Sequence, residues 1–275
     1  MMAMNIPMER NTGLQFGNPL LSLENWCAIG FRLFGQATIM LFQAVGYIFH
    51  GGINWAEVMR QANMIGIGSL YVVGVTGLFT GFAMSLQISK ELAAFGADTA
   101  VGGVVALALI REIGPITAGV MVAGRVGSAM AAELSSMVVS EQIDALKIMR
   151  VDPVQFLVVP RFLAALLTIP ALSIYSMFLG LAGAIFIAQA KANIPPDIFL
   201  DSVKQTVVGT DFITHLIKSV INACIIIFFS CSIGLSARGG AEDVGHATTR
   251  AVVWTMTIIF IANYIVTALS PLHTS

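Results

Sequence analysis

Uncharged and mainly apolar stretches recur along this sequence at lengths that suit membrane helices. Four windows contain no Asp, Glu, Lys or Arg, and they cover residues 61–89, 162–190, 219–237 and 251–275. A fifth window, 99–124, is apolar except for Arg111 and Glu112 near its middle. Because a helix needs about 20 apolar residues to cross the hydrocarbon core, the pattern predicts five transmembrane helices.

A further uncharged segment near the N-terminus, residues 33–56, is interpreted differently. Its apolar part, 38–49, is short, follows Arg32 and Gln36 on an amphipathic run, and ends at His50-Gly51-Gly52. This pattern favours a helix lying in the membrane plane, with a sixth span as the alternative. We expect an unassigned extension at 1–22, an interfacial amphipathic helix region at 23–60 and a five-helix domain at 61–275.

The composition supports an integral membrane protein. Hydrophobic residues make up 57% of the 275 residues and charged residues 11%, with a mean hydropathy of +0.86. An ordinary soluble domain is roughly 25% charged, so a soluble globular enzyme is excluded. The net charge of −1 offers no broad cationic surface, so no nucleic-acid partner is expected. The fold class predicted is an all-α membrane protein.

Basic residues are distributed unevenly between the two sides of the expected membrane. With the N-terminus in the cytoplasm, nine fall on the cytoplasmic side and three on the other, apart from Arg111 and Lys218 within the membrane. The cytoplasmic set is Arg10, Arg32, Arg60, Arg125, Lys147, Arg150, Arg161, Arg238 and Arg250, and the opposite set is Lys90, Lys191 and Lys204. Positive loops stay in the cytoplasm, so the C-terminus is expected outside.

Motifs of soluble nucleotide-binding and metal-dependent enzymes are absent. None of the five lysines follows a glycine, so there is no phosphate-binding loop, and the four histidines are scattered and none precedes a glutamate. The three cysteines suggest small buried hydrophobes rather than a disulfide framework. We therefore expect no metal site, no directly bound cofactor and no catalytic residue in this chain.

The charged pair Arg111-Glu112 is the strongest candidate for function. Ionisable groups at membrane depth usually face a protein interior or a water-filled cavity. Adjacent residues point about 100° apart on a helix, so each needs its own partner, and Lys218 is the natural one for Glu112. Pro115 has no amide hydrogen for the carbonyl of Arg111, so this carbonyl is left free and the helix is expected to kink.

Small residues recur every four positions within residues 123–136. Such a ridge lets another helix approach closely, so its role is expected to be packing, within or between subunits. Its central members are Gly124, Gly127, Ser128 and Ala131, and Gly77 and Gly81 form a weaker example in the first span.

A short cytoplasmic helix is expected at about 140–151. Ser140 is a candidate N-cap, and Asp152-Pro153 a stop signal. Ile143, Leu146 and Met149 form an apolar stripe, and Glu141, Asp144, Lys147 and Arg150 are charged. A helix of this kind can dock in a groove of a soluble partner or lie flat on the membrane, and we favour docking.

Several of these segments together resemble the MlaE permease family. They are 110–115, 123–134, 140–153, Pro160-Arg161, Lys218-Ser219 and 247–252, and the resemblance extends from about Phe31 to Leu269. The family supplies the permease subunit of ABC transporters that move phospholipids or other lipids between the inner and outer membranes of double-membraned bacteria and chloroplasts.

The resemblance implies a homodimer of five-span subunits in the inner (cytoplasmic) membrane, with the N-terminus cytoplasmic and the C-terminus periplasmic. The implied partners are a cytoplasmic ABC ATPase, which binds ATP and Mg²⁺, an extracytoplasmic MCE-domain protein, and phospholipid. The residues implied to bind lipid are Arg111, Glu112, Ile113, Lys218, Met84, Leu92 and Phe95, and those implied to couple to the ATPase are Glu141, Ile143, Asp144, Leu146, Lys147 and Arg150.

A secondary transporter driven by an ion gradient is the alternative function. In that case Arg111, Glu112 and Lys218 would form an ion relay, and no ATPase would be needed. Buried charges and an interrupted helix suit this function too. The family resemblance and the cytoplasmic docking helix favour the ATP-driven lipid transporter.

Overall fold

The computed structural model describes residues 19–50, 53–237 and 239–270, and the regular elements in these residues are all helices. The elements are α1 (Pro19–His50), α2 (Trp55–Ala94), η1 (Asp98–Ala100), α3 (Val101–Ala108), η2 (Leu109–Ile113), α4 (Gly114–Val122), η3 (Ala123–Gly127), α5 (Ser128–Val139), α6 (Gln142–Ile148), η4 (Val154–Val158), α7 (Val159–Ala192), α8 (Pro196–Thr206), α9 (Gly209–Leu235) and α10 (Ala241–Leu269). Of these, η1 is a 3₁₀ turn and η2, η3 and η4 are π-helical.

Among the described residues, five continuous helical segments are long and apolar enough to cross a membrane. They are Trp55–Ala94, Asp98–Val139, Val154–Ala192, Gly209–Leu235 and Ala241–Leu269. The predicted all-α architecture with five spans is therefore confirmed. α1 is not among the five, and it ends at His50, so residues 55–60 of the expected interfacial region belong to the first spanning helix.

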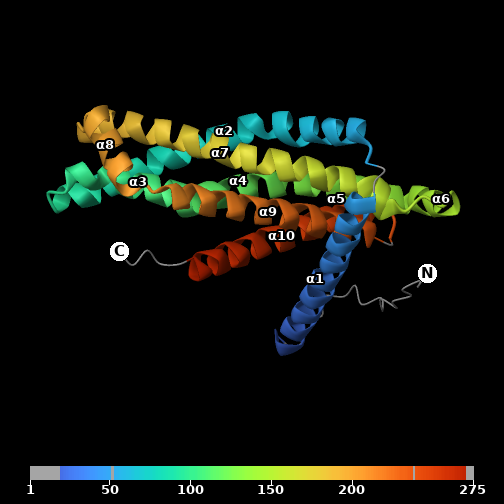
Figure 1. Cartoon of the computed structure of the whole chain (residues 1–275). Helices are drawn as coiled ribbons and strands as arrows, with labels where there is room; N and C mark the ends of the chain where they lie inside the picture. The colour runs from blue at the N-terminus through green and yellow to red at the C-terminus, as the bar shows by residue number, and fades with distance from the viewer. Residues whose placement is uncertain (1–18, 51–52, 238, 271–275) are drawn as a thin grey trace.

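The spanning helices form an elongated bundle with α6 at one end and α8 at the other, as Figure 1 shows. The 40 residues of α2 correspond to roughly 60 Å of helix, about twice the hydrocarbon thickness of a bilayer. Its ends must therefore extend beyond the hydrocarbon core. α1 slants away from the bundle and meets it near the α6 end (Figure 1).

Glycines allow α2 and α7 to pack with their backbones in contact. A Cβ atom on Gly77 would lie 2.5 Å from Oγ of Ser176, and one on Gly81 would overlap the carbonyl group of Gly180. The Gly77-x-x-x-Gly81 pattern therefore packs within the chain, between two helices that are distant in sequence.

The main hydrophobic core lies between α1, α7, α9 and the second span. Ala37 and Ala44 of α1 are buried there, and the rings of Phe162 and Phe228 lie 4.8 Å apart between α7 and α9. Phe34 of α1 also lies close to a phenylalanine of α9, with ring centroids 6.3 Å apart. This part of α1 is packed on the bundle and is not an isolated surface helix.

The second span extends beyond the window from which it was predicted. The second span does not end near residue 124 but continues to Val139, and Arg125 lies within it at the π-helical turn η3. Nη1 of Arg125 donates to Oγ of Ser69 at 2.9 Å. Ser69 is nine residues after Arg60 on α2, which corresponds to roughly 13 Å along the helix. The guanidinium fits there because Gly68 has no side chain: a Cβ atom would lie 2.6 Å from Nη2.

Candidate functional site

The second span is interrupted where its charged pair lies. η2 contains Arg111 and Glu112, and Pro115 follows at the start of α4. The π-helical turn and the proline leave carbonyl groups without their usual amide partners. The interruption expected from the sequence takes the form of a π-helical turn, and its carbonyls face α9.

One face of α9 supplies the missing hydrogen-bond donors. His215 Nδ1 lies 2.8 Å from the carbonyl oxygen of Ile110, Lys218 Nζ donates to that of Arg111 at 2.6 Å, and Asn222 Nδ2 donates to that of Pro115 at 3.0 Å. All three donor side chains are at most 1% exposed. The carbonyl that Pro115 leaves free is thus satisfied by a lysine 107 residues away.

Each member of the charged pair has a buried partner of opposite charge. Arg111 Nε pairs with Oδ1 of Asp211 at 2.7 Å, and Lys218 Nζ pairs with Oε1 of Glu112 at 2.8 Å. The side chains of Asp211 and Lys218 are 3% and 1% exposed, whereas those of Arg111 and Glu112 are 40% and 38% exposed. The site therefore presents one cation and one anion at its surface, and each is held in place by its buried partner.

α10 completes the surroundings of Glu112. Thr267 Oγ1 donates to Oε1 at 2.7 Å, and Asn263 Nδ2 donates to Oε2 at 3.3 Å. Lys218 Nζ also lies 2.7 Å from Oγ1 of Thr267. Residues from two other spans, α9 and α10, thus fix the carboxylate.

The histidine of this site is held as a structural hydrogen-bonding group. The carbonyl of Ile110 can only accept, so Nδ1 of His215 carries a proton. Nε2 lies 2.9 Å from the hydroxyl oxygen of Ser173, which can donate to it. A neutral imidazole satisfies both contacts, and it connects the interrupted turn to α7.

The apolar residues implied to contact lipid do not all lie together. Met84, Leu92 and Ile113 are partly buried and pack against the same core cluster, which includes Val101 and Leu109. Phe95 caps the end of α2 and is 81% exposed, outside that cluster. Met84, Leu92 and Ile113 therefore pack against one cluster, and Phe95 lies outside it.

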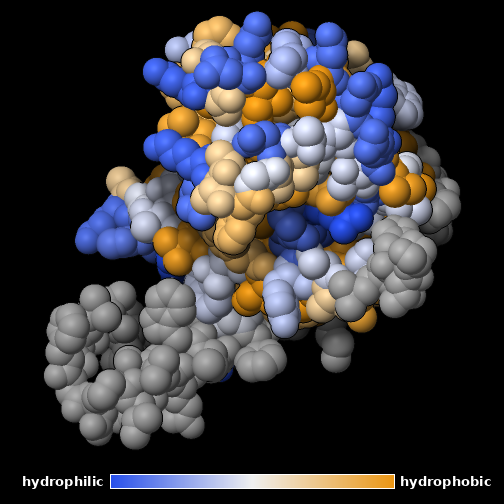
Figure 2. Space-filling view, turned by 90° about the vertical axis from the view of Figure 1, so that its left-hand side faces the viewer, coloured by the Kyte–Doolittle hydropathy of each residue, from blue (hydrophilic) through white to orange (hydrophobic). Residues whose placement is uncertain are grey.

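Polar residues gather at the α8 end of the bundle. Figure 2 looks at this end and shows hydrophilic side chains around its edge and also in a hollow between apolar residues. α8 contributes Asp197, Asp201 and Lys204 to this end. The charged residues Lys90 and Glu91 lie in the last part of α2, which reaches the same end (Figure 1).

The small residues of the second span face other helices of the same chain. A Cβ on Gly127 would lie 2.8 Å from Oγ of Ser230, and one on Gly124 would lie 3.4 Å from the Met256 methyl carbon. Ala131 is fully buried against α9. Ser128 instead bonds the carbonyls of its own helix at Gly124 and Arg125.

The helix expected at about 140–151 is shorter than that. α6 covers Gln142–Ile148, and Ser140 is not its N-cap, since the Ser140 hydroxyl donates back to Ser136 at the end of α5. The residue before α6 is Glu141, which has a left-handed backbone (φ 59°). Left-handed backbone at Arg150 (φ 60°) follows α6. The chain reverses sharply on both sides, so only two turns of helix fit between them.

The other residues implied to couple to an ATPase lie at this end of the bundle. Ile143 is buried, Leu146 is partly buried, and Asp144 and Lys147 pair at 2.8 Å on the exposed face. Met149 of the expected apolar stripe is 64% exposed. Asp152 also differs from its expected role, because its Oδ1 accepts from the amide of Val154 and so begins the next helix.

The partner of Arg111 was missed by sequence reasoning, although a signal exists. Asp211, His215, Lys218 and Asn222 are spaced by four, three and four residues, which places them on one face of an otherwise apolar helix. This spacing predicts a buried polar face on α9. Only Lys218 of the four was recognised.

Comparison with known proteins identifies the family. Residues 58–269 match the family Permease MlaE. The chain belongs to the MlaE permease family. It is 40% identical over 243 residues to a probable ABC transporter permease protein of Synechocystis sp., covering 88% of this chain and 91% of that protein.

Two further relatives extend the MlaE permease match. The protein TRIGALACTOSYLDIACYLGLYCEROL 1, chloroplastic, of Arabidopsis thaliana is 37% identical over 230 residues, which is 84% of this chain and 66% of that protein. A probable ABC transporter permease protein of Rickettsia typhi is 38% identical over 235 residues, 86% of this chain and 91% of that protein. This MlaE permease is therefore a multi-pass membrane protein and a transporter permease subunit.

Proposed function

We propose that this permease moves phospholipids between the inner and outer membranes, driven by ATP hydrolysed in a separate subunit. The observation that carries the proposal is the pair Arg111 and Glu112, which is half-exposed within a membrane span and anchored to buried Asp211 and Lys218. Such charges at membrane depth need a polar ligand or water on their exposed side.

The chemistry of the pair suits a phospholipid headgroup. Only Nε of the Arg111 guanidinium has a partner among the described residues, so its terminal N–H groups can donate to phosphate oxygens. Glu112 offers a carboxylate to an amine or hydroxyl of the headgroup. Ile113 directly follows the pair in the chain, and it packs with Met84 and Leu92 against one core cluster, so these three residues offer apolar surface for the acyl chains.

The ATP-driven cycle needs partner proteins. We propose a homodimer that binds a cytoplasmic ABC ATPase through α6 and an extracytoplasmic MCE-domain protein at the α8 end, with ATP and Mg²⁺ bound by the ATPase. The ABC permease names of the relatives favour this assembly over an ion-coupled carrier. The proposed orientation in the inner membrane places the N-terminus and α6 in the cytoplasm and the C-terminus in the periplasm.

Purification tests the assembly directly. The tagged protein is isolated in mild detergent, and co-purifying proteins and lipids are determined by mass spectrometry. We expect an ATPase, an MCE-domain protein and phospholipid. Recovery of the chain without an ATPase, under conditions in which known ABC complexes survive, would favour the ion-coupled carrier.

The variant Glu112→Gln tests the site. It keeps the side-chain shape but removes the charge that pairs with Lys218, so we expect ATP-dependent lipid transfer between vesicles to fall at least tenfold while the complex still assembles. Glu242→Gln on α10 is a matched control, because that side chain is 92% exposed. Equal transfer rates for Glu112→Gln and the control would contradict the assignment.

A further inference from the structure

A further charged residue, Arg125, lies at membrane depth in the second span. Its side chain is exposed in the π-helical turn η3 and meets α2 at Ser69. A hydrocarbon core about 30 Å thick, centred on the uncharged window 61–89 of α2, extends roughly ten residues to either side of residue 75. Ser69 lies within that range, so the guanidinium of Arg125 is at the level of the hydrocarbon core.

This guanidinium has no acidic partner among the residues that the structure describes. Within those residues, the bond from Nη1 to the hydroxyl oxygen of Ser69 is the only hydrogen bond or ion pair of the Arg125 side chain. Ser69 is neutral, so the positive charge is not compensated. The remaining N–H groups of the guanidinium can donate to an anion.

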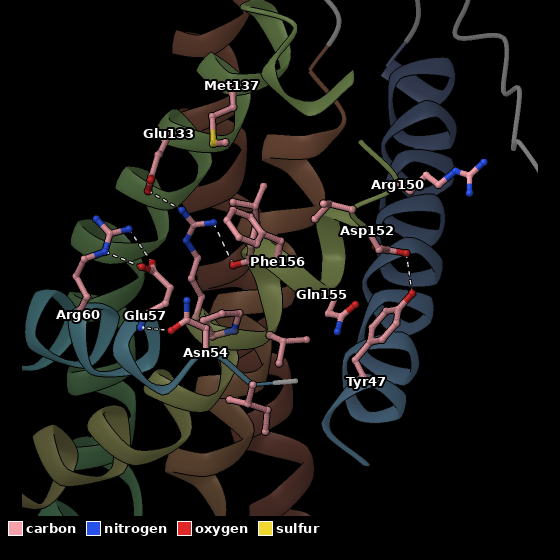
Figure 3. Close-up of a pocket in the computed structure, with 16 residues that line it drawn as sticks. Tyr47, Asn54, Glu57, Arg60, Glu133, Met137, Arg150, Asp152, Gln155 and Phe156 are labelled. Atoms are coloured by element: carbon pink, nitrogen blue, oxygen red, sulfur yellow. Dashed lines mark hydrogen bonds and ion pairs between the residues drawn. The ribbon is translucent and has the colours of Figure 1, made fainter. Parts of the chain in front are cut away.

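The arginines at the α6 end of the bundle differ from Arg125, because each has a carboxylate partner. Arg161 pairs with Glu133 of α5 at 2.8 Å, and Arg60 makes two bonds to Glu57 (Figure 3). An uncompensated cation is more costly at membrane depth than at this end. Arg125 therefore needs an anion that the described part of the chain does not supply.

A partly exposed stripe of the second span connects Arg125 with the Arg111–Glu112 pair. From Glu112 to Glu133, the residues that are not buried come in adjacent pairs every four positions, and Arg125 forms one such pair with Gly124. The π-helical turns η2 and η3 use more residues per turn than an α-helix, which keeps a four-residue repeat nearer to one face. The two arginines are roughly 21 Å apart along the helix axis.

The surface between the two arginines is suited to acyl chains. Its partly exposed residues are apolar, apart from Thr117. The hydroxyl of Thr117 donates to the carbonyl of Ile113 in its own helix, so it is already satisfied. A ligand on this surface therefore meets apolar side chains and a cation at each end.

We propose that Arg125 binds the phosphate group of a phospholipid part-way across the membrane, as a second binding position on the stripe that carries Arg111. Charge complementarity carries this assignment, because phosphate is the anion that a lipid brings and a guanidinium donates to it in a fixed geometry. A second copy of the chain is a poorer source of the anion, since Glu112 and Asp211 are already paired. The proposal rests on the proposed transport function only in taking this lipid to be the transported one.

Site-specific photocrosslinking locates the lipid. The full-length protein carries the photoreactive residue p-benzoylphenylalanine in place of Ala129, which is exposed one turn from Arg125, and is irradiated in nanodiscs containing radiolabelled phosphatidylethanolamine. The same residue in place of Phe178, which is 60% exposed on α7, reports lipid that merely surrounds the protein. We expect lipid adducts at both positions, with only those at 129 depending on Arg125.

Variants test this dependence. Arg125→Gln should reduce the adducts at 129 roughly tenfold, as loss of a charge-assisted hydrogen bond predicts, and leave those at 178 unchanged. Arg125→Lys keeps the charge and should retain most of the adducts. Thr117→Val on the same stripe is the matched control and should have no effect. Equal labelling of Arg125→Gln and Thr117→Val would refute the site.

A second variant moves the guanidinium without removing its charge. Gly68→Ala places a methyl group 2.6 Å from Nη2 of Arg125, so the side chain must shift. We expect the adducts at 129 to fall several-fold while the protein still elutes as a single peak in size-exclusion chromatography. Unchanged adducts in both Gly68→Ala and Arg125→Gln would show that the guanidinium does not hold the lipid.

The choice of probe identifies the ligand. Radiolabelled diacylglycerol, which lacks a phosphate, should label position 129 at least tenfold less than phosphatidylethanolamine, and equal labelling would overturn the phosphate assignment. Loss of the lipid adducts on addition of inorganic phosphate would show that the site takes a soluble anion and would overturn the assignment to a lipid. Adducts between two copies of the chain, in place of lipid adducts, would show that a second copy covers Arg125.

These measurements need no ATP, so the two proposals can fail separately. Adducts at 129 that depend on Arg125, in a protein that transfers no lipid, would contradict the transport proposal alone. Lipid transfer that requires Glu112, without any dependence of the adducts on Arg125, would overturn the second binding position alone.

Discussion

Replacing Lys218 with methionine tests whether the lysine stabilises the interrupted second span. The variant loses the bond to the carbonyl of Arg111 and the ion pair with Glu112. Because Pro115 cannot supply another donor, the carbonyl becomes an unsatisfied group at a cost of about 1–3 kcal/mol. Glu112 is more than a third exposed and keeps its bonds to α10, so the lost ion pair adds only about 1 kcal/mol or less.

The predicted loss of unfolding free energy for Lys218→Met is therefore about 2 kcal/mol. It is measured by reversible unfolding with dodecyl sulfate in mixed micelles, followed by circular dichroism. Lys204→Met on α8 is the control, since that side chain is 75% exposed, and it should change stability by less than about 0.5 kcal/mol.

A double-mutant cycle isolates the contact between Lys218 and Glu112. Glu112→Gln should destabilise the wild-type protein more than it destabilises Lys218→Met, with a coupling energy of about 1 kcal/mol. A Lys218→Met variant as stable as the Lys204→Met control would refute the reasoning, because the free carbonyl would then cost nothing.

Three further predictions concern other parts of the fold. Gly81→Val should separate α2 from α7, seen as loss of the monodisperse peak in size-exclusion chromatography, and a normal peak would contradict the close backbone contact. The hydrogen bond to Asp152 raises the pKa of Tyr47 above its ordinary value of 10.0. This contact therefore stabilises the fold below pH 10, and the stabilisation is lost as the pH rises through the raised pKa. The difference between the absorbance titrations of the wild type and Tyr47→Phe should show a midpoint above pH 10. Glu141→Lys combined with Asp144→Lys should release the ATPase from the purified complex, and unchanged co-purification would argue against coupling through α6.

The spans could be predicted from the sequence because the bilayer imposes a simple rule on composition. Four charge-free windows and one apolar window with a single charged pair located the five spanning helices of the described residues, but not their ends, since α2 begins before Arg60 and the second span continues past Arg125. A charged side chain is tolerated within a span when a neighbouring helix supplies a partner of opposite charge or a hydrogen bond. Which helices are neighbours depends on the tertiary structure, and windows along one sequence do not contain this information.

The candidate site was predictable for one ion pair and not for the other. Lys218 was found as the partner of Glu112 because few ionisable residues lie within the spans. Asp211 was overlooked because the uncharged window taken for this span begins at residue 219, whereas α9 begins at Gly209. Its Oδ2 does accept from the amide of Val208, while Oδ1 holds Arg111, so one carboxylate has both roles.

The polar face of α9 also has a consequence for how the chain enters the membrane. Insertion of a Lys at the centre of a lone helix costs about 2.5–3.5 kcal/mol, and α9 carries Lys218 within its length as well as Asp211 near its start. Their partners in the second span are 100 or more residues nearer the N-terminus and are synthesised first. The partners of Asp211 and Lys218 are therefore already present when α9 enters the membrane. A circular permutation that placed α9 ahead of the second span would remove this advantage.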